Sequence, residues 1–318
     1  MSTLPLFEEP QPELAVRLAG PLAELAGAGI YIGASSWKYE GWIGQVYTRE
    51  PYLVRGRFSQ KKFQAECLNE YAKTFPIVCG DFSFYQFPAQ AYWQRLFASA
   101  PPSLLYSFKV PEDITVKRFP AHARYGARAG LNNETFLNAE LLKEAFLRPL
   151  EPYRGRIAAL IFEFGAFPRQ AFDSEPAFLD RLDAFLEQLP PGWRYSVEVR
   201  NPELLSPEYF RLLRSHRAAH VFNAWTRMPE LETQMRIEEA FTADYTVVRA
   251  LLRKGRPYEE AVSKFSPYLH VQEPNPGARR ALRNLIARSR RQRQMAFVFV
   301  NNRLEGNAPG TIASLLED

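Results

Sequence analysis

The chain has 318 residues, of which 46% are hydrophobic and 24% are charged. This is ordinary globular composition, and a chain of this length buries enough surface to need no disulfide or metal staples. Its net charge of +5, from 40 Lys and Arg against 35 Asp and Glu, is too mild to indicate nucleic-acid binding by itself.

Two cysteines, Cys67 and Cys79, argue against a disulfide framework and suit a reducing compartment. Residues 1–12 lack the cationic and apolar regions of a signal peptide. No apolar run approaches the roughly 20 residues that span a bilayer. We therefore expect a cytoplasmic protein with no membrane partner, and we leave its oligomeric state open.

Short apolar runs alternate with amphipathic stretches along nearly the whole chain. Runs rich in Val, Ile, Phe and Tyr are typical of buried parallel strands. The expected strands are Ile30–Ser35, Ile77–Phe82, Leu104–Lys109, Ile157–Glu163, Tyr195–Arg200, Ala218–Ala224, Tyr245–Arg249 and Met295–Asn301. Helices are expected between them, including Lys61–Lys73 and Pro176–Leu189, whose apolar residues share one face.

Eight strands alternating with helices predict an α/β fold, a single-domain (β/α)8 barrel of the TIM type. Long loops follow strands 1, 3 and 7, and loops after strands carry the functional face of such barrels. The competing fold, an open doubly wound sheet, usually has a glycine-rich turn that residues 33–36 do not supply. Residues 1–29 are expected to form an extension that packs on the barrel of residues 30–318.

The expected strands end in polar residues that do not suit a hydrophobic layer. Closing the strands into a cylinder would bring these residues to one charged pocket at the carboxyl ends of the strands. The residues expected to be catalytic are Asp81, Lys109, Glu163 and Glu198. The residues expected to bind substrate are Ser35, Trp37, Tyr39, Trp42, Tyr85, Arg200, Asn223, Arg249, Asn301 and Asn302.

The cations Lys109, Arg200 and Arg249 are expected to hold an anion, while the nearby carboxylates pair with them and move protons. Structural alternatives stay open for several members. Glu198 and Arg200 can form a purely structural ion pair, the aromatic residues of 37–42 can pack a loop, and the asparagines after strand 8 can cap a turn.

Metal and cofactor motifs are not apparent. The four histidines, His122, His216, His220 and His270, lie away from the expected strand ends, so we expect no metal site of the histidine type. The three carboxylates offer oxygen ligands to Mg²⁺, but the neighbouring cations disfavour it. No phosphate-cradling or dinucleotide motif occurs, so no cofactor is expected, with a divalent metal left open.

The run Gly33–Trp42, GASSWKYEGW, resembles the opening motif of the YecE-like family, which is catalogued as domain of unknown function 72. Further matching motifs follow in order over roughly residues 30–315. They are Phe84-Tyr85-Gln86-Phe87-Pro88, Phe108-Lys109-Val110-Pro111 with Ile114-Thr115, Glu198-Val199-Arg200, Arg249, and Asn301-Asn302 with Gly306 and Ala308-Pro309. The resemblance implies a TIM-type barrel with a pocket at its strand ends, and it implies no particular reaction.

The chain is a divergent member by this resemblance. Cys79 and Asp81 stand where the family usually has Glu and Asn, Glu163 stands where Gln is common, and Gly165 stands where Pro is common. Residues 250–252 replace a histidine-glycine pair that usually follows the arginine of strand 7. A proton-transfer role carried by that histidine cannot operate here, and an acidic residue at 81 or 163 would partly replace it.

Three functions follow from these observations. The preferred hypothesis is an enzyme that acts on a small anionic or polyhydroxy substrate by acid–base chemistry, with the reaction class left open between hydrolase, lyase and isomerase. The second is a nucleic-acid-binding protein or nuclease that uses the basic helix Arg279–Arg293 and the basic loop after strand 3. The third is a non-catalytic sensor of a small sugar-like or anionic molecule.

Overall fold

The computed structural model describes residues 11–167, 172 and 175–317. Within these residues, eight parallel strands close into a barrel in the order β1-β10-β9-β8-β7-β6-β5-β4. The barrel strands are β1 (Ile30–Ala34), β4 (Ile77–Gly80), β5 (Leu105–Lys109), β6 (Ile157–Phe164), β7 (Tyr195–Val199), β8 (Ala219–Ala224), β9 (Tyr245–Ala250) and β10 (Met295–Val300). The prediction of a single-domain TIM-type barrel is confirmed.

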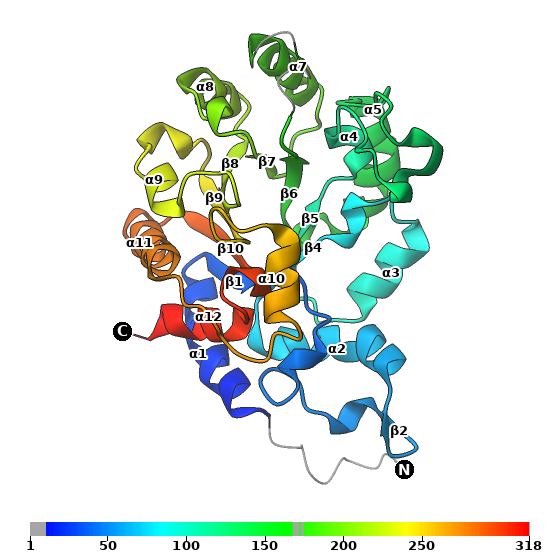
Figure 1. The fold of residues 1–318 in the computed structure, drawn as a ribbon, viewed down its shortest axis with the longest axis vertical. Helices are drawn as coiled ribbons and strands as arrows, with labels where there is room; N and C mark the ends of the chain where they lie inside the picture. Colours follow the sequence, from blue (N-terminus) through cyan, green and yellow to red (C-terminus); the bar gives the residue numbers. More distant parts are fainter. Residues whose placement is uncertain (1–10, 168–171, 173–174, 318) are drawn as a thin grey trace.

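Helices surround this barrel (Figure 1). They are α1 (Glu13–Gly27), α2 (Gln60–Thr74), α3 (Gln90–Ala98), α4 (Glu112–Thr115), α5 (Ala139–Leu142), α6 (Arg148–Leu150), α7 (Glu175–Glu187), α8 (Pro207–Ser215), α9 (Leu231–Met235), α10 (Tyr258–Phe265), α11 (Pro276–Gln292) and α12 (Ala308–Leu316). The helices predicted at 61–73 and 176–189 correspond to α2 and α7. In the loop after β1, the short strands β2 (Leu53–Val54) and β3 (Arg57–Phe58) form an antiparallel hairpin.

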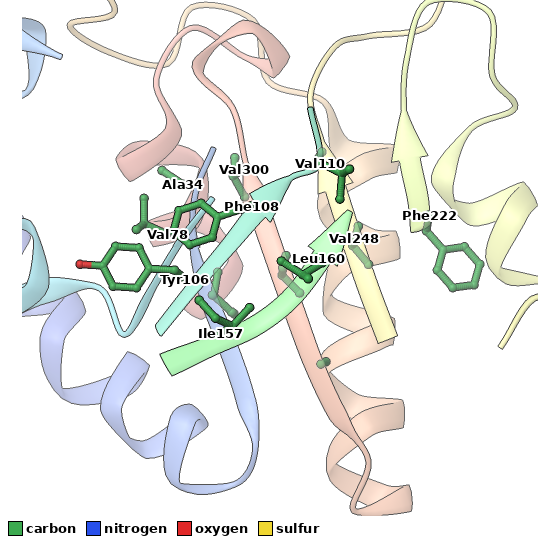
Figure 2. Packing of buried hydrophobic residues seen from close by; sticks show 14 of the residues in the cluster. Ala34, Val78, Tyr106, Phe108, Val110, Ile157, Leu160, Phe222, Val248 and Val300 are labelled. Carbon is green, nitrogen blue, oxygen red and sulfur yellow. The ribbon is translucent and has the colours of Figure 1, made fainter. Parts of the chain in front are cut away.

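The alternation of side chains along each strand divides the core into two layers. Outward-facing residues such as Tyr106, Phe108 and Val248 pack in the large cluster between the strands and the helices (Figure 2). Inward-facing residues fill the barrel with a second apolar cluster. That cluster includes Ile77, Cys79, Ala159, Ile161, Val221, Val247, Phe297 and Phe299. Two positions after Cys79, Val221 and Val247, the residues are polar: Asp81 lies just beyond β4, Asn223 on β8 and Arg249 on β9.

The long loops follow the first, third and seventh barrel strands, as predicted, at residues 35–59, 110–138 and 251–275. Near the N-terminus, α1 precedes β1 and packs against β1, α2 and α12. Residues 1–10 of the predicted extension lie outside the described residues. No helix of the described part is long and apolar enough to cross a bilayer.

Two glycines of the motif at residues 33–42 lie where the backbone approaches another segment closely. A Cβ atom placed on Gly33 would lie 1.9 Å from the carbonyl oxygen of Ile77 on β4, and one on Gly41 would lie 1.9 Å from the carbonyl oxygen of Pro267. No side chain fits at either position, because the obstacle is backbone. The motif therefore fixes how β1 and its loop pack against the rest of the barrel.

We predict that Gly33→Ala lowers the free energy of unfolding by about 3 kcal/mol, because the added methyl group forces β1 and β4 apart. Gly155→Ala is the matched control, since its Cβ would have no neighbour within 4 Å. This control should change stability by no more than about 0.5 kcal/mol. Urea unfolding followed by circular dichroism measures both, and equal stability of the two variants would contradict the prediction.

Candidate functional site

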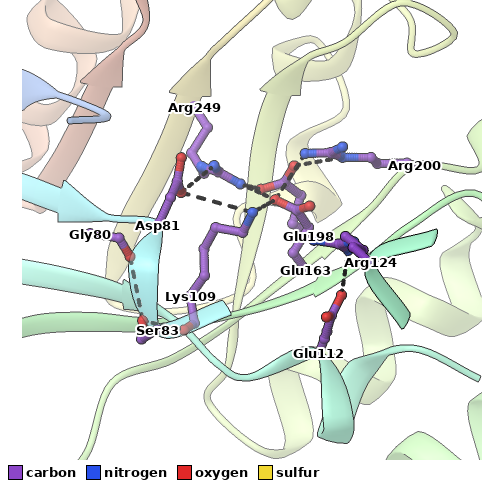
Figure 3. A network of polar contacts seen from close by, with 10 residues as sticks. All are labelled: Gly80, Asp81, Ser83, Lys109, Glu112, Arg124, Glu163, Glu198, Arg200 and Arg249. Atoms are coloured by element: carbon purple, nitrogen blue, oxygen red, sulfur yellow. Dashed lines mark hydrogen bonds and ion pairs between the residues drawn. The ribbon is translucent and has the colours of Figure 1, made fainter. Parts of the chain in front are cut away.

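Charged side chains from the barrel strands, or from the residues just after them, meet at the carboxyl end of the barrel (Figure 3). Lys109 is the last residue of β5, and Arg249 lies near the end of β9. Glu163 and Glu198 stand opposite each other in the register of β6 and β7. Together with the residues just beyond β4 and β7 they form what we call the mouth cluster. Its members are Asp81, Lys109, Glu163, Glu198, Arg200 and Arg249.

Glu163 lies at the centre of the mouth cluster. Its Oε2 atom accepts a hydrogen bond from Arg249 Nη1 at 2.6 Å, and it forms ion pairs with Lys109 Nζ at 3.0 Å and Arg200 Nη2 at 2.8 Å. Burial alone would raise the pKa of Glu163, but the three cations, Arg200 first, outweigh burial and hold that pKa well below its usual range. Glu163 is therefore a fixed anion at neutral pH, which suits an electrostatic role better than proton transfer.

Arg249 reaches from β9 to carboxylates on the opposite strands. Its Nη1 also donates to Glu198 Oε2, and its Nη2 lies 3.4 Å from Asp81 Oδ1. Burial by itself would lower the pKa of Arg249, but the facing carboxylates, led by Glu198, raise it well above its ordinary value. Arg249 thus keeps its charge although its side chain is only 2% exposed.

Two cations of the cluster lie against aromatic rings that are not among the predicted site residues. The guanidinium carbon of Arg200 lies 3.7 Å from the centre of the Trp225 ring, and Lys109 Nζ lies 3.9 Å from the centre of the Phe84 ring. Cation–π contacts of this kind orient a charged group without consuming its hydrogen-bond donors. Trp225 directly follows β8, so its place at a strand end was the available signal.

The mouth cluster reaches solvent mainly through Asp81 and Arg200, whose side chains are 30% and 12% exposed. The other four side chains are between 0% and 7% exposed. Asp81 is also the most loosely held carboxylate, because its Oδ1 lies 3.8 Å from Lys109 Nζ and 3.4 Å from Arg249 Nη2. It is therefore the carboxylate that can exchange a protein contact for a ligand contact most easily.

Two uncharged predicted binding residues, Ser35 and Asn223, are buried at the same end of the barrel. Asn223 Nδ2 donates to the carbonyl oxygens of Val199 at 3.1 Å and Val221 at 3.3 Å. Among the described residues, Asn223 Oδ1 and Ser35 Oγ have no hydrogen-bond partner. This end of the barrel therefore holds unused polar atoms besides the ion pairs.

Four other predicted binding residues make contacts that hold the loops together. Trp42 Nε1 donates to Asn302 Oδ1 at 3.2 Å, which ties the loop after β1 to the turn after β10. Asn301 Oδ1 accepts from the backbone N–H of Arg303 at 3.0 Å and begins that turn. Trp37 is buried in the outer apolar layer. Among the described residues, Asn302 Nδ2 has no hydrogen-bond partner. Because the contacts above join loops and turns to one another, we leave these four residues out of the proposed site.

Tyr39 and Tyr85 are the two remaining predicted binding residues. Burial raises the pKa of Tyr39 to about 12, with a smaller contribution from the charge of Asp81, so its hydroxyl stays neutral. Tyr85 is 54% exposed, and the guanidinium carbon of Arg124 lies 4.9 Å from its ring centre. Arg124 comes from the loop after β5, which thus reaches over the turn that follows β4.

The basic loop after β5 is held in place by its own acidic residues. Arg124 Nη2 lies 2.7 Å from Glu112 Oε2 and Arg128 Nη1 lies 2.7 Å from Asp113 Oδ1. Arg118 Nε donates to a backbone carbonyl of the same loop. These contacts order the loop and offset much of its positive charge.

The basic segment at residues 279–293 forms most of α11, and most of its arginines already have acceptors. These pairs are Arg279 with Glu305, Arg280 with Glu232, Arg283 with the carbonyl oxygens of Ser314 and Glu317, Arg288 with Glu238, and Arg290 with Glu24. Helix α11 therefore offers a nucleic acid less unpaired positive charge than its sequence suggests.

The histidines serve other parts of the fold. Burial lowers the pKa of His220 to about 3, and its ring lies 3.2 Å from the Tyr209 hydroxyl. His216 Nε2 lies 2.6 Å from Asp183 Oδ1. In the part of the chain that the structure describes, no group of three or more His, Cys, Asp or Glu is arranged to hold a metal ion.

Two hollows lie on the outside of the barrel. One, of about 1200 Å³, lies beside α2 and is lined by residues that include Tyr52 and Glu70. Glu70 already accepts from the Tyr52 hydroxyl at 2.6 Å and from Thr48, so its oxygens are occupied by the loop after β1. The other, of about 230 Å³, lies between α2 and α3. Neither lining includes a member of the mouth cluster. We place the candidate site at the cluster because of its gathered charges and not because of a hollow.

We predict that Glu163→Gln destabilises the fold by about 3 kcal/mol at neutral pH, because two buried cations and the largely buried Arg200 lose their shared anion. The depressed pKa of Glu163 stabilises the folded state above the ordinary Glu pKa of about 4.3, and this stabilisation is lost as the pH falls further. The wild-type free energy of unfolding should therefore drop below about pH 4, and Glu163→Gln should drop less.

Glu144→Gln is the control for this titration, because the exposed Glu144 carboxylate pairs with Arg148 away from the barrel mouth. Its pH profile should match that of the wild type. A Glu163→Gln profile that also matches would show that the buried contacts do not set the acid stability.

Comparisons with known proteins agree with the barrel. The chain is similar to the crystal structure of a DUF72 family protein from Thermotoga maritima, with 20% identity and a TM-score of 0.59 over 89% of this chain and 96% of that chain. It is also similar to two structures of a DUF72 family protein from Enterococcus faecalis. These have 14% and 15% identity and TM-scores of 0.57 and 0.53, cover 90% and 78% of this chain, and span 94% and 91% of their own chains.

At these identities the structural likeness shows the fold alone. No curated protein matches the chain. The family model described as protein of unknown function DUF72 matches residues 31–318. This match confirms the resemblance drawn from the motifs, and the chain therefore belongs to the DUF72 family.

Proposed function

We propose that the chain binds a small anionic or polyhydroxy ligand at the mouth cluster and acts on it by acid–base chemistry. The observation that supports this proposal most is that six ionisable side chains gather at the end of the barrel. Apolar side chains could fill the same positions. Taking charges out of water costs several kcal/mol each, and apolar replacements of buried ion networks are often as stable. Such an arrangement is typical of sites where charge is needed for function.

In this proposal, Arg200 and Lys109 hold the anionic group of the ligand. Arg200 is the most exposed cation of the cluster, and its contact with Trp225 keeps its plane fixed. Lys109 is held by Phe84 and by Glu163, so it is oriented before the ligand arrives. A prearranged pair of cations binds an anion with little cost of reorganisation.

Asp81 is the proposed proton-transferring carboxylate. It is the most exposed and most loosely paired acid of the cluster, whereas Glu163 is held as a fixed anion by three cations. The family resemblance supports the same choice, because Asp81 stands where relatives usually have Asn and the family histidine after Arg249 is missing. Tyr39 supplies a neutral hydroxyl within electrostatic reach of Asp81.

We predict that Lys109→Met weakens ligand binding by about tenfold or more, because the anion loses a fixed cation in a buried setting. Asp81→Asn should bind the ligand but lose turnover. The ligand used is whichever organic acid or sugar phosphate raises the wild-type melting temperature most in a thermal-shift screen. Calorimetry measures binding, and product analysis of the same compound measures turnover.

Asp183→Asn is the matched control, since Asp183 pairs with His216 on the outside of the barrel. It should leave binding and turnover unchanged. Full turnover by Asp81→Asn would refute the proposed proton transfer, while wild-type binding with no turnover of any compound would favour the sensor. Binding of a DNA or RNA oligonucleotide that weakens steeply with salt would favour the nucleic-acid hypothesis instead.

A further inference from the structure

A donor and an acceptor lie unused on adjacent strands beside the mouth cluster. Asn223 on β8 and Arg249 on β9 are direct partners in the register of these two strands. Val221 and Val247, two positions earlier, belong to the cluster that fills the barrel. Because side chains alternate along a strand, Asn223 and Arg249 also point into the barrel.

The hydrogen bonds of both side chains determine which atoms are left over. Asn223 uses its Nδ2 group on the carbonyl oxygens of Val199 and Val221, so Oδ1 is the free end of the amide. Arg249 uses Nη1 and Nη2 on the carboxylates of the mouth cluster. Among the described residues, Asn223 Oδ1 and Arg249 Nε have no partner, although both side chains are almost completely buried.

Buried polar atoms are rarely left unsatisfied, so this pair indicates a missing partner. The partner must donate to the amide oxygen and accept from the guanidinium Nε–H. A carboxylate offers no donor, and an ammonium group offers no acceptor. A hydroxyl group offers both on one atom.

We propose that Asn223 Oδ1 and Arg249 Nε together bind one hydroxyl group of the ligand. This inference rests on the proposed function and narrows it. The ligand is then an anionic polyol, whose anionic group meets Arg200 and Lys109 and whose hydroxyl group lies deeper, between β8 and β9. A site that hydrogen-bonds a hydroxyl discriminates strongly against the analogue that lacks it, because two buried groups are left unpaired.

Matched pairs of compounds test the hydroxyl subsite in the wild-type protein. Each pair keeps the anionic group and carbon skeleton and differs in hydroxyl groups: tartrate with succinate, glycerol 3-phosphate with propyl phosphate, and gluconate with hexanoate. Calorimetry should show that the hydroxylated member of at least one pair binds about tenfold more tightly or better. Equal affinity within every pair would overturn the subsite and leave the anion site of the proposed function standing.

Failure of all six compounds to bind would overturn the proposed function and the subsite together. If the hydroxyl-free members bind and the hydroxylated members bind no better, the two buried atoms hold a structural water. The two failures are therefore distinguishable in the same experiment.

Asn223→Leu keeps the branched shape of the side chain and removes the acceptor, together with the Nδ2 donor to Val199 and Val221. It should abolish the preference for the hydroxylated compound while leaving the affinity for its hydroxyl-free partner within about twofold. Asn138→Leu is the control, because the exposed Asn138 caps α5 far along the chain from β8 and should keep the preference. Persistence of the full preference in Asn223→Leu would overturn the proposal.

A second variant covers the case in which Asn223→Leu does not fold. Asn223→Gln keeps both an amide oxygen to accept and an amide NH2 to donate, and it should retain part of the preference for the hydroxylated compound. Loss of the preference in a folded Asn223→Gln, together with its persistence in the control, would count against the amide oxygen as the acceptor. The comparison within the wild type decides the proposal without either variant.

Discussion

Three cations, two of them buried, share one carboxylate oxygen at the centre of the barrel mouth, and the rest of the site depends on that compensation. Lys109, Arg200 and Arg249 come from β5, β7 and β9 or their ends, and all of them contact Glu163 on β6. None of these charges can stay buried without its partners, because an isolated ion in the protein interior costs several kcal/mol. The ends of four strands are therefore held in one relative arrangement by electrostatics as well as by backbone hydrogen bonds.

Because of the same charge compensation, chemically similar residues of the cluster have different roles. Glu163 is too strongly stabilised as an anion to exchange protons near neutral pH, and Arg249 is too deeply buried to meet solvent. Asp81 and Arg200 lie at the exposed edge of the cluster. The contacts of Asp81 with Lys109 and Arg249, at 3.8 Å and 3.4 Å, are longer than those of Glu163. A ligand can contact these two residues while the inner charged side chains stay in place and keep the local electrostatic potential unchanged. A prearranged polar site lowers the cost of binding and reaction in this way.

The sequence predicted the barrel well because its signals are local. Apolar runs mark the strands, and the polar residue two positions after an inward apolar one, as with Val247 and Arg249, marks the mouth. Contacts between loops were not predictable in this way. Trp42 and Asn302 are 260 positions apart and meet only because the loops after β1 and β10 adjoin. The arginines of α11 looked free in the sequence, but their acceptors, such as Glu24 and Glu238, come from distant segments. Strand ends can be read from periodicity, whereas the path of a long loop cannot.

On our proposal, the mouth cluster binds a ligand and does not serve only to hold the strand ends together. A crystal structure of the protein with its most stabilising organic acid or sugar phosphate tests this directly. We expect an anionic oxygen of the ligand within about 3 Å of Arg200 or Lys109, and we expect Asp81 to have moved away from its present contacts. A ligand bound elsewhere on the surface, with all six charged side chains still paired as they are now, would contradict it.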